Sequence, residues 1–184
     1  MRLYIGLVHF PVYNKNQKKI ASAITTIDLH DIARLARTYD VKRFFAITPL
    51  DDQQALAQRV RNHWTNGYGA KYNHHRKQAI ELLEIVPSLE RAKEAIEARE
   101  GEAPLIIATD ASQQKDRSIC YERARSMVQD DNVVFLIFGT AWGLDKTVMD
   151  GADHVLHPIV GRTDYNHLSV RTAVAIIVDR LAGR

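Results

Sequence analysis

Residues that could bind a ligand gather in three short segments, each at the end of a predicted strand. These segments begin at Thr109, Gly139 and His157 and read TDAS, GTAWG and HPIVG. Loops that follow neighbouring parallel strands surround one cavity. Gly139 and Gly143 would let the backbone approach a ligand, and free loop N–H and C=O groups can read an adenine edge. Alternatively, these glycines serve only tight turns between strand and helix, and spacing alone favours neither interpretation.

A polar stripe on a predicted helix also carries groups suited to chemistry. His30, Arg34 and Arg37 lie at positions i, i+4 and i+7, so they share one helical face. Arginine at such a face suits contact with phosphate, whereas the plainer interpretation is a solvated stripe. Asp164 is the one acid in the segment 158–166. It could accept a proton during a reaction, or it could cap the last helix.

Several common kinds of site are missing from the sequence. There is no GxGxxG, GxxxxGK[ST] or GxSxG motif, so nothing indicates a dinucleotide site, a phosphate-binding P-loop or a serine nucleophile. The histidine pairs 74–75 and 154/157 lack Cys or acidic partners at ligand spacing, and we therefore expect no metal site. Cys120 is the single cysteine; we expect it inside a helix as a core residue.

Charge is distributed unevenly along the 184 residues. Residues 1–76 hold 12 Lys and Arg against 5 Asp and Glu, whereas residues 77–184 hold 13 against 17. A basic amino-terminal part favours a polyanionic partner such as RNA, although a solvated basic face would look the same. The apolar runs are too short to span a membrane, and no secretion signal is evident. We therefore expect a cytoplasmic protein with no membrane partner.

Apolar runs alternate with helical periodicities along the whole chain, which predicts an α/β fold with a mainly parallel sheet. We expect a single domain, residues 1–184, with about six strands and helices on both faces. The predicted strands are 3–10, 43–48, 82–86, 104–109, 132–138 and 153–157. One helix is predicted to begin near 26–28, and others run over 52–65, 72–79, 89–99, 116–129, 144–149 and 167–181, with a loop at 66–73. The last helix has the clearest pattern, since Val170, Val174, Ile177 and Leu181 share one face.

Three segments resemble the SPOUT (α/β-knot) RNA methyltransferases, and most closely a stand-alone bacterial branch of that superfamily. They are FLIFGTAWGL at 135–144, LHPIVGRTDYNHLSVRTAVAIIVDRLAG at 156–183 and LHDIARLARTYDVKRFFAITP at 29–49. The resemblance implies that S-adenosylmethionine (SAM) is the cofactor and that residues of about 104–184 form a trefoil knot around it. It also implies a homodimer whose active site lies at the subunit interface.

The resemblance assigns the cofactor site to the three loops and the start of the last helix. The implied residues are Thr109, Asp110, Ala111, Phe138, Gly139, Thr140, Gly143, His157, Pro158, Ile159, Asn166, Leu168 and Ser169.

Arg37 stands where part of the family has a functional arginine. The sequence departs from the family pattern nearby, because Asp31 and Ala33 replace the usual Asn and Gly. Arg34 therefore competes with Arg37 for the catalytic role, and Asp164 is the third candidate.

The function that follows is SAM-dependent methyl transfer to RNA, either tRNA or rRNA. The sulfonium methyl is already electrophilic, so the protein mainly needs to align the acceptor and exclude water. Two alternatives are a Rossmann-like or flavodoxin-like enzyme for a small phosphorylated metabolite, and a knotted RNA-binding module without catalysis. Phosphate contacts would come from Lys15, Lys18, Lys19, Arg34, Arg37, Arg59, Arg61 and Lys71. Tyr13, Trp64, Tyr68 and Tyr72 could stack on bases, although Trp64 fits a core position better.

Overall fold

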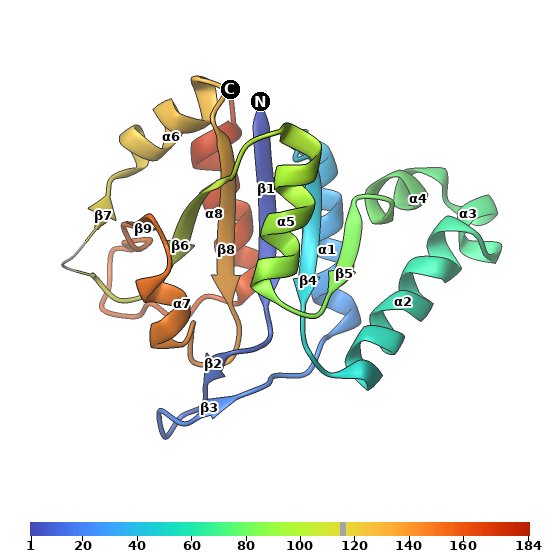
Figure 1. The fold of residues 1–184 in the computed structure, drawn as a ribbon, viewed down its shortest axis with the longest axis horizontal. Coiled ribbons are helices and arrows are strands. Elements are labelled where there is room, and N and C mark those ends of the chain that lie inside the picture. Colours follow the sequence, from blue (N-terminus) through green and yellow to red (C-terminus); the bar gives the residue numbers. More distant parts are fainter. Residues whose placement is uncertain (115–116) are drawn as a thin grey trace.

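A seven-stranded sheet forms the centre of the protein (Figure 1). The computed structural model describes residues 1–114 and 117–184. The strand order is β5-β4-β1-β8-β6-β9-β7, and every neighbouring pair is parallel. The strands are β1 (Arg2–Val8), β4 (Arg43–Ile47), β5 (Leu83–Val86), β6 (Leu105–Thr109), β7 (Ser118–Ile119), β8 (Val133–Gly139) and β9 (His154–Leu156). The predicted parallel α/β fold is confirmed, with one strand more than the six expected.

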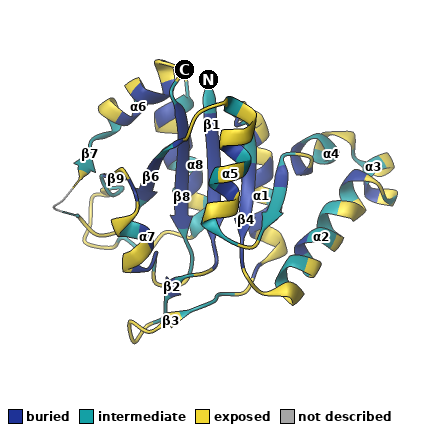
Figure 2. Ribbon diagram, in the orientation of Figure 1, coloured by how far each residue is buried: buried dark blue, intermediate teal, exposed yellow. Residues whose placement is uncertain are grey.

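The strands alternate their side chains between two hydrophobic cores, as the pleat of a strand requires. In β1, Leu3, Ile5 and Leu7 join the core beneath α1 (Thr26–Thr38), α6 (Tyr121–Gln129) and α8 (Val170–Ala182). Tyr4 and Val8 join the other core, beneath α5 (Leu89–Glu100) and α7 (Lys146–Asp150). The sheet is accordingly buried on both faces, and exposed residues lie mainly on outer helical surfaces and loops (Figure 2).

Three helices form a group beyond the edge strand β5. They are α2 (Asp51–Thr65), α3 (Tyr68–Tyr72) and α4 (His74–Ile80), and α4 packs against α1 (Figure 1). The predicted loop at 66–73 is therefore wrong in part, since α3 occupies most of it. Gly69 explains the difference, because a Cβ there would lie 2.7 Å from Cε3 of Trp64. Glycine here allows a close helix contact and does not mark a turn.

The segment before α6 differs from the sequence-based prediction. The helix begins at Tyr121, after the two-residue strand β7, and not near Asp116, which lies outside the described residues. Cys120 occupies the N-cap position and is only partly buried, so its predicted place inside the helix is wrong. Alternation over so short a strand gives no usable sequence signal.

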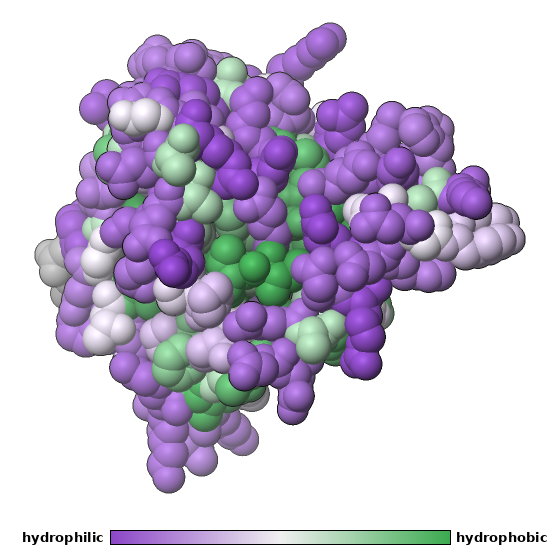
Figure 3. Space-filling model, turned by 45° about the vertical axis from the view of Figure 1, so that its right-hand side comes forward, coloured by the Kyte–Doolittle hydropathy of each residue, from purple (hydrophilic) through white to green (hydrophobic). Residues whose placement is uncertain are grey.

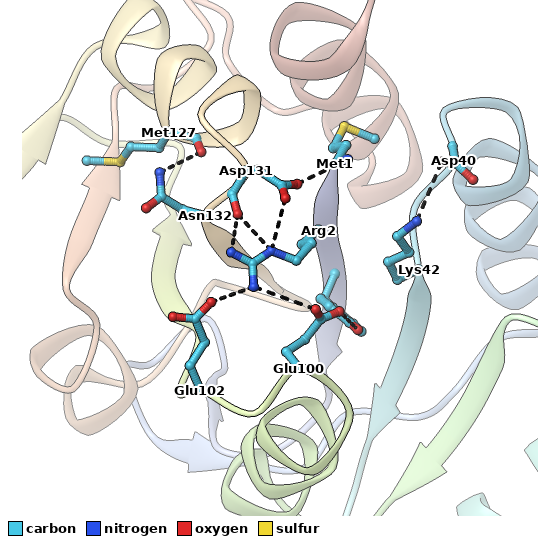
Figure 4. Close-up of polar contacts among 10 residues, drawn as sticks. Met1, Arg2, Asp40, Lys42, Glu100, Glu102, Met127, Asp131 and Asn132 are labelled. Atoms are coloured by element: carbon cyan, nitrogen blue, oxygen red, sulfur yellow. Dashed lines mark hydrogen bonds and ion pairs between the residues drawn. The ribbon is translucent and has the colours of Figure 1, made fainter.

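The amino ends of the strands meet at one edge, where a charged cluster fixes the start of the chain (Figure 4). Arg2 donates to the Asp131 carbonyl at 2.7 Å and to the Glu102 carboxylate at 2.5 Å. The Met1 ammonium lies 3.3 Å from the Asp131 carboxylate. The carboxyl ends of the strands, at the opposite edge, are left for the ligand loops. Because β8, β6 and β9 are neighbours in the sheet, their loops do converge there.

A short antiparallel pair accompanies this edge. It consists of β2 (Val12–Tyr13) and β3 (Lys19–Ile20). Tyr13 exchanges two backbone hydrogen bonds of 3.0 Å with the loop after β8, one with Trp142 and one with Gly143. The hairpin thereby supports the loop that the sequence assigns to a ligand.

Candidate cofactor site

A cavity of about 750 Å³ lies at the carboxyl ends of β6 and β8 and between the first turns of α1 and α8. This volume is within the usual range for a small-molecule site. Eleven of the thirteen predicted cofactor residues line it: Thr109, Asp110, Ala111, Phe138, Gly139, Thr140, Gly143, Ile159, Asn166, Leu168 and Ser169. His157 and Pro158 are partly buried just before Ile159 but do not line the cavity. The His157 backbone N–H instead donates to the Ile119 carbonyl at 2.9 Å.

The two glycines of the loop after β8 are required for different reasons. At Gly139, a Cβ would lie 2.7 Å from the Leu144 backbone nitrogen, so a side chain would force the loop apart. Gly143 has φ 101°, a conformation that L side chains rarely adopt. A Cβ at Gly143 would meet only Asp110 Oδ2, at 4.0 Å, so this position faces the open space between two loops. The backbone there can approach a ligand closely.

A partly buried series of polar side chains connects the same loop to the amino-terminal half of the protein. Thr140 Oγ1 donates to the Val8 carbonyl at 3.0 Å and lies 2.5 Å from Ser22 Oγ. Ser22 Oγ in turn lies 3.0 Å from Nδ1 of His9. Burial lowers the pKa of His9 to about 4, so its ring is neutral at physiological pH. Thr140 is therefore held by two segments that are far from it in the sequence, the end of β1 and the segment around Ser22.

The loop after β6 is joined to the long segment before α8. Asp110 Oδ1 accepts from both the backbone N–H and the hydroxyl of Ser112, each at 2.6 Å. Asn166 Nδ2 donates to the Ala111 carbonyl at 2.8 Å. Ser169 caps α8 by accepting from the Thr172 N–H at 3.3 Å. The alternative role of Asp164 as this helix cap is accordingly wrong.

An ion pair joins α1 and α8 at the wall of the cavity. Arg171 Nη1 lies 2.9 Å from Asp28 Oδ1, and Arg171 Nε lies 3.3 Å from Asp31 Oδ2. Asp28 is almost fully buried and also accepts the Thr25 hydroxyl at 2.6 Å. The position of Asp28 in the first turn of α1 is favourable for a carboxylate, because the positive end of the helix dipole lies there.

The sequence did not predict four other residues that line the cavity, three near the amino terminus and one in α8. Ser22, Thr25, Asp28 and Arg171 all line the cavity, yet none belongs to the loops with a recognisable pattern. One signal was available in the resemblance, which marked Asp31 as a departure from the family pattern. The structure gives this acid a partner, Arg171, in the other half of the chain.

The three predicted catalytic residues lie outside the cavity. Arg34 and Arg37 are exposed on α1, and Asp164 is exposed in the loop before α8. Their side chains form no hydrogen bond or ion pair with any other described residue. Their catalytic roles stay predictions, and a single chain does not bring these residues to its own site.

A sequence profile described as SAM-dependent RNA methyltransferase matches residues 2–183. The chain belongs to this family. Among the residues that the structure describes, no group of three His, Cys, Asp or Glu is placed to hold a metal ion. Over the same residues, no helix is long and apolar enough to cross a membrane.

Two relatives of this chain differ in length. A tRNA (guanine-N(1)-)-methyltransferase of Oleidesulfovibrio alaskensis is 42% identical over 181 residues, which is 98% of this chain and 42% of that protein. An uncharacterized protein of Aquifex aeolicus is 39% identical over 183 residues, or 99% of this chain and 89% of that protein. The chain thus spans less than half of the first relative, whose name describes the whole longer protein.

Solved structures of methyltransferases share the fold. TrmJ from Z. mobilis ZM4 has a TM-score of 0.65 at 13% identity, covering all of this chain and 69% of that one. The SpoU methyltransferase AviRb from Streptomyces viridochromogenes, in complex with AdoMet, has a TM-score of 0.59 at 15% identity. It covers 98% of this chain and 58% of AviRb. These neighbours support the predicted SPOUT fold.

The cavity suits SAM on the chemistry of its own walls. Phe138, Ile159 and Leu168 supply apolar surface for the adenine ring and the methylene groups of SAM. Thr109, Asp110 and Asn166 supply polar groups for a ribose or an amino acid end. The open space beside Gly143 allows the loop backbone to contact the ligand.

Proposed function

We propose that this protein binds SAM in the cavity and transfers its methyl group to RNA as a homodimer. The observation that carries the proposal is the convergence of eleven family-implied cofactor residues on one cavity of suitable size. SAM supplies an electrophilic sulfonium methyl. The protein aligns the acceptor with that methyl and keeps water from the site. Gly143 would offer its backbone, and Ile159 and Leu168 would cover the apolar part of the cofactor.

We propose tRNA as the RNA class, because a relative over the full length of this chain carries a tRNA methyltransferase name. We do not propose guanine N1 as the atom that this protein methylates, because the relative's name describes a chain of more than twice this length. A test adds labelled SAM to total RNA from a strain that lacks the protein. Nucleoside mass spectrometry then identifies the base and atom. Label in tRNA supports the proposal, and label in rRNA alone overturns the choice of tRNA.

A homodimer is supported by the surface around the cavity. Ile27, Trp142, Val160, Tyr165 and Leu168 are large apolar residues that are exposed, and all lie in segments that border the cavity. A second copy would cover this rim. It would also bring the arginines of its own α1 toward the neighbouring site, which a single chain does not do. Light scattering tests the dimer, and a monomer at micromolar concentration contradicts it.

Subunit mixing tests whether the site is shared. A Gly143→Val subunit should bind the cofactor too weakly for turnover, and an Arg37→Ala subunit lacks the proposed catalytic group. Each variant alone should be inactive, whereas co-folded mixtures should regain part of the activity if Arg37 acts across the interface. No recovery in verified mixed dimers contradicts a shared site.

A trefoil knot over about 104–184 remains part of the proposal, as the resemblance implies. The 2.8 Å contact from Asn166 to Ala111 joins the two segments that the knot would bring together.

A further inference from the structure

A stretch without any acidic residue covers most of the helices beyond β5. Residues 53–80 contain five Lys and Arg and three His, and no Asp or Glu. Arg61 is used internally, since its Nε donates to the Leu83 carbonyl at 2.8 Å, and Lys77 lies 3.8 Å from Glu81. Arg59 and Lys71 are exposed and have no such partner among the described residues. Two exposed cations on this surface are therefore available to an anionic partner.

Two tyrosines project from the same surface. Tyr68 and Tyr72 are 73% and 75% exposed, and they lie one turn apart on α3. Their rings stack with centroids 6.0 Å apart and an interplanar angle of 22°. Neither ring belongs to a hydrophobic core. Parallel aromatic faces held in water are a suitable platform for unpaired bases.

The helix that carries the tyrosine pair packs tightly against Trp64. Gly69 packs so closely on Trp64 that a Cβ would lie 2.7 Å from its ring. The Arg76 guanidinium lies over the same Trp64 ring, 4.7 Å from its centroid. In Figure 3 the α3 end projects from the body and is hydrophilic to neutral in colour, while hydrophobic atoms gather in the central hollow.

The platform is connected to the cofactor cavity by α1. The His30 ring meets the Trp64 ring edge-on at 5.5 Å. His30 lies two residues after Asp28, which lines the cavity, and Arg34 follows one turn later. Helix α1 thus links the cavity to the helices that carry the tyrosine pair.

We propose that Tyr68 and Tyr72, with Lys71 and Arg59, form a docking site for unpaired nucleotides of the RNA substrate. The proposal rests on RNA being the substrate and adds where that RNA is held. Bases would stack on the tyrosines and phosphates would contact the two cations. A single-stranded segment or loop fits this chemistry, because a duplex does not expose the faces of its bases.

The first test measures binding of a fluorescein-labelled stem–loop RNA and of a blunt duplex with the same stem by anisotropy. The wild type should prefer the stem–loop. Tyr68→Ala/Tyr72→Ala should weaken stem–loop binding by at least about tenfold. Tyr68→Phe/Tyr72→Phe should retain it, because phenylalanine keeps the stacking face. Thermal melting and SAM affinity, both expected to be unchanged, show that the alanine variant is folded.

A matched charge reversal tests the cations. Lys71→Glu and Arg123→Glu change the net charge equally, and Arg123 is exposed on α6 at the other end of the sheet (Figure 1). Only Lys71→Glu should weaken stem–loop binding and reduce its dependence on salt. Equal effects of the two substitutions, or full binding by the folded double alanine variant, overturn the docking site.

Failure of the docking site is distinguishable from failure of the proposed function. Methylation of RNA that is insensitive to the tyrosine substitutions overturns the docking site alone. Tyrosine-dependent RNA binding without SAM binding or methyl transfer overturns the proposed function and supports the docking site.

Discussion

Gly143 and Gly101 provide a matched pair for testing where the cofactor lies. They are the two described glycines with φ in the left-handed region, at 101° and 78°. Gly101 follows α5, and a Cβ there would meet no atom within 4 Å. Gly143 faces the cavity. Alanine at either position costs about 1–2 kcal/mol of backbone strain, so each variant should lose roughly 2–8 °C in Tm.

The two variants should differ in cofactor affinity. Alanine at Gly143 places a methyl group in the space that the proposed cofactor shares with the loop backbone. Moving the ligand outward by this amount should weaken SAM binding by at least about tenfold, or about 1.4 kcal/mol. Gly143→Val should weaken it further, because its side chain fills more of the cavity. Gly101→Ala should bind SAM like the wild type.

Calorimetric titration with SAM, well below both melting temperatures, measures the difference directly. The similar loss of Tm is the internal control, because it shows that backbone strain destabilises both variants to the same extent. Equal SAM affinity for Gly143→Ala and Gly101→Ala would refute the assignment of the cavity. The cofactor would then bind without close approach to this loop.

Three further perturbations test the site. Arg37→Ala should reduce methyl transfer by at least about 100-fold and leave SAM affinity intact; equal turnover with wild type rejects this residue, and the same assay on Arg34→Ala tests its competitor. Arg171→Ala should cost about 1.5–3 kcal/mol in urea unfolding, since Asp28 loses a charged hydrogen bond; a loss below about 0.5 kcal/mol contradicts the importance of this pair. Because the pKa of His9 is about 4 in the fold and near 6.5 unfolded, the stability present above pH 6.5 should fall by about 3 kcal/mol as pH drops toward 4. His9→Asn should flatten this pH profile, and an unchanged slope argues against His9 as its source.

Much of the fold could be predicted because its signals are local. The apolar run of β8 and the helical spacing of α8 each report burial directly from neighbouring residues. The errors occurred where a tertiary contact decides the structure. The two glycines of the segment NGYGAKYN suggested a loop, whereas Gly69 serves the contact between α3 and Trp64. A two-residue strand such as β7 exists only because β9 pairs with it.

The cofactor loops could be predicted for a similar reason. Each loop directly follows a strand, so its place at the carboxyl edge follows from the parallel topology. Asp28 and Arg171 could not be predicted in this way, because they are 143 positions apart and meet only when α1 and α8 pack. The opposite holds for Arg34 and Arg37. The resemblance assigns them a catalytic role, but in a single chain neither residue reaches the cavity.

The cavity is consequently a joint product of both halves of the chain. The charge distribution suggested an amino-terminal half for RNA and a carboxyl-terminal half for the cofactor. Two sets of contacts contradict that division. The hydrogen-bonded series His9–Ser22–Thr140 links the amino-terminal half to a cofactor loop, and the ion pair Asp28–Arg171 links it to α8. His30 then follows Asp28 on α1 and contacts Trp64 beneath the tyrosine pair. A single rigid helix therefore borders the cofactor cavity at its first turn and supports the proposed RNA surface from its second, which fixes the two sites relative to each other.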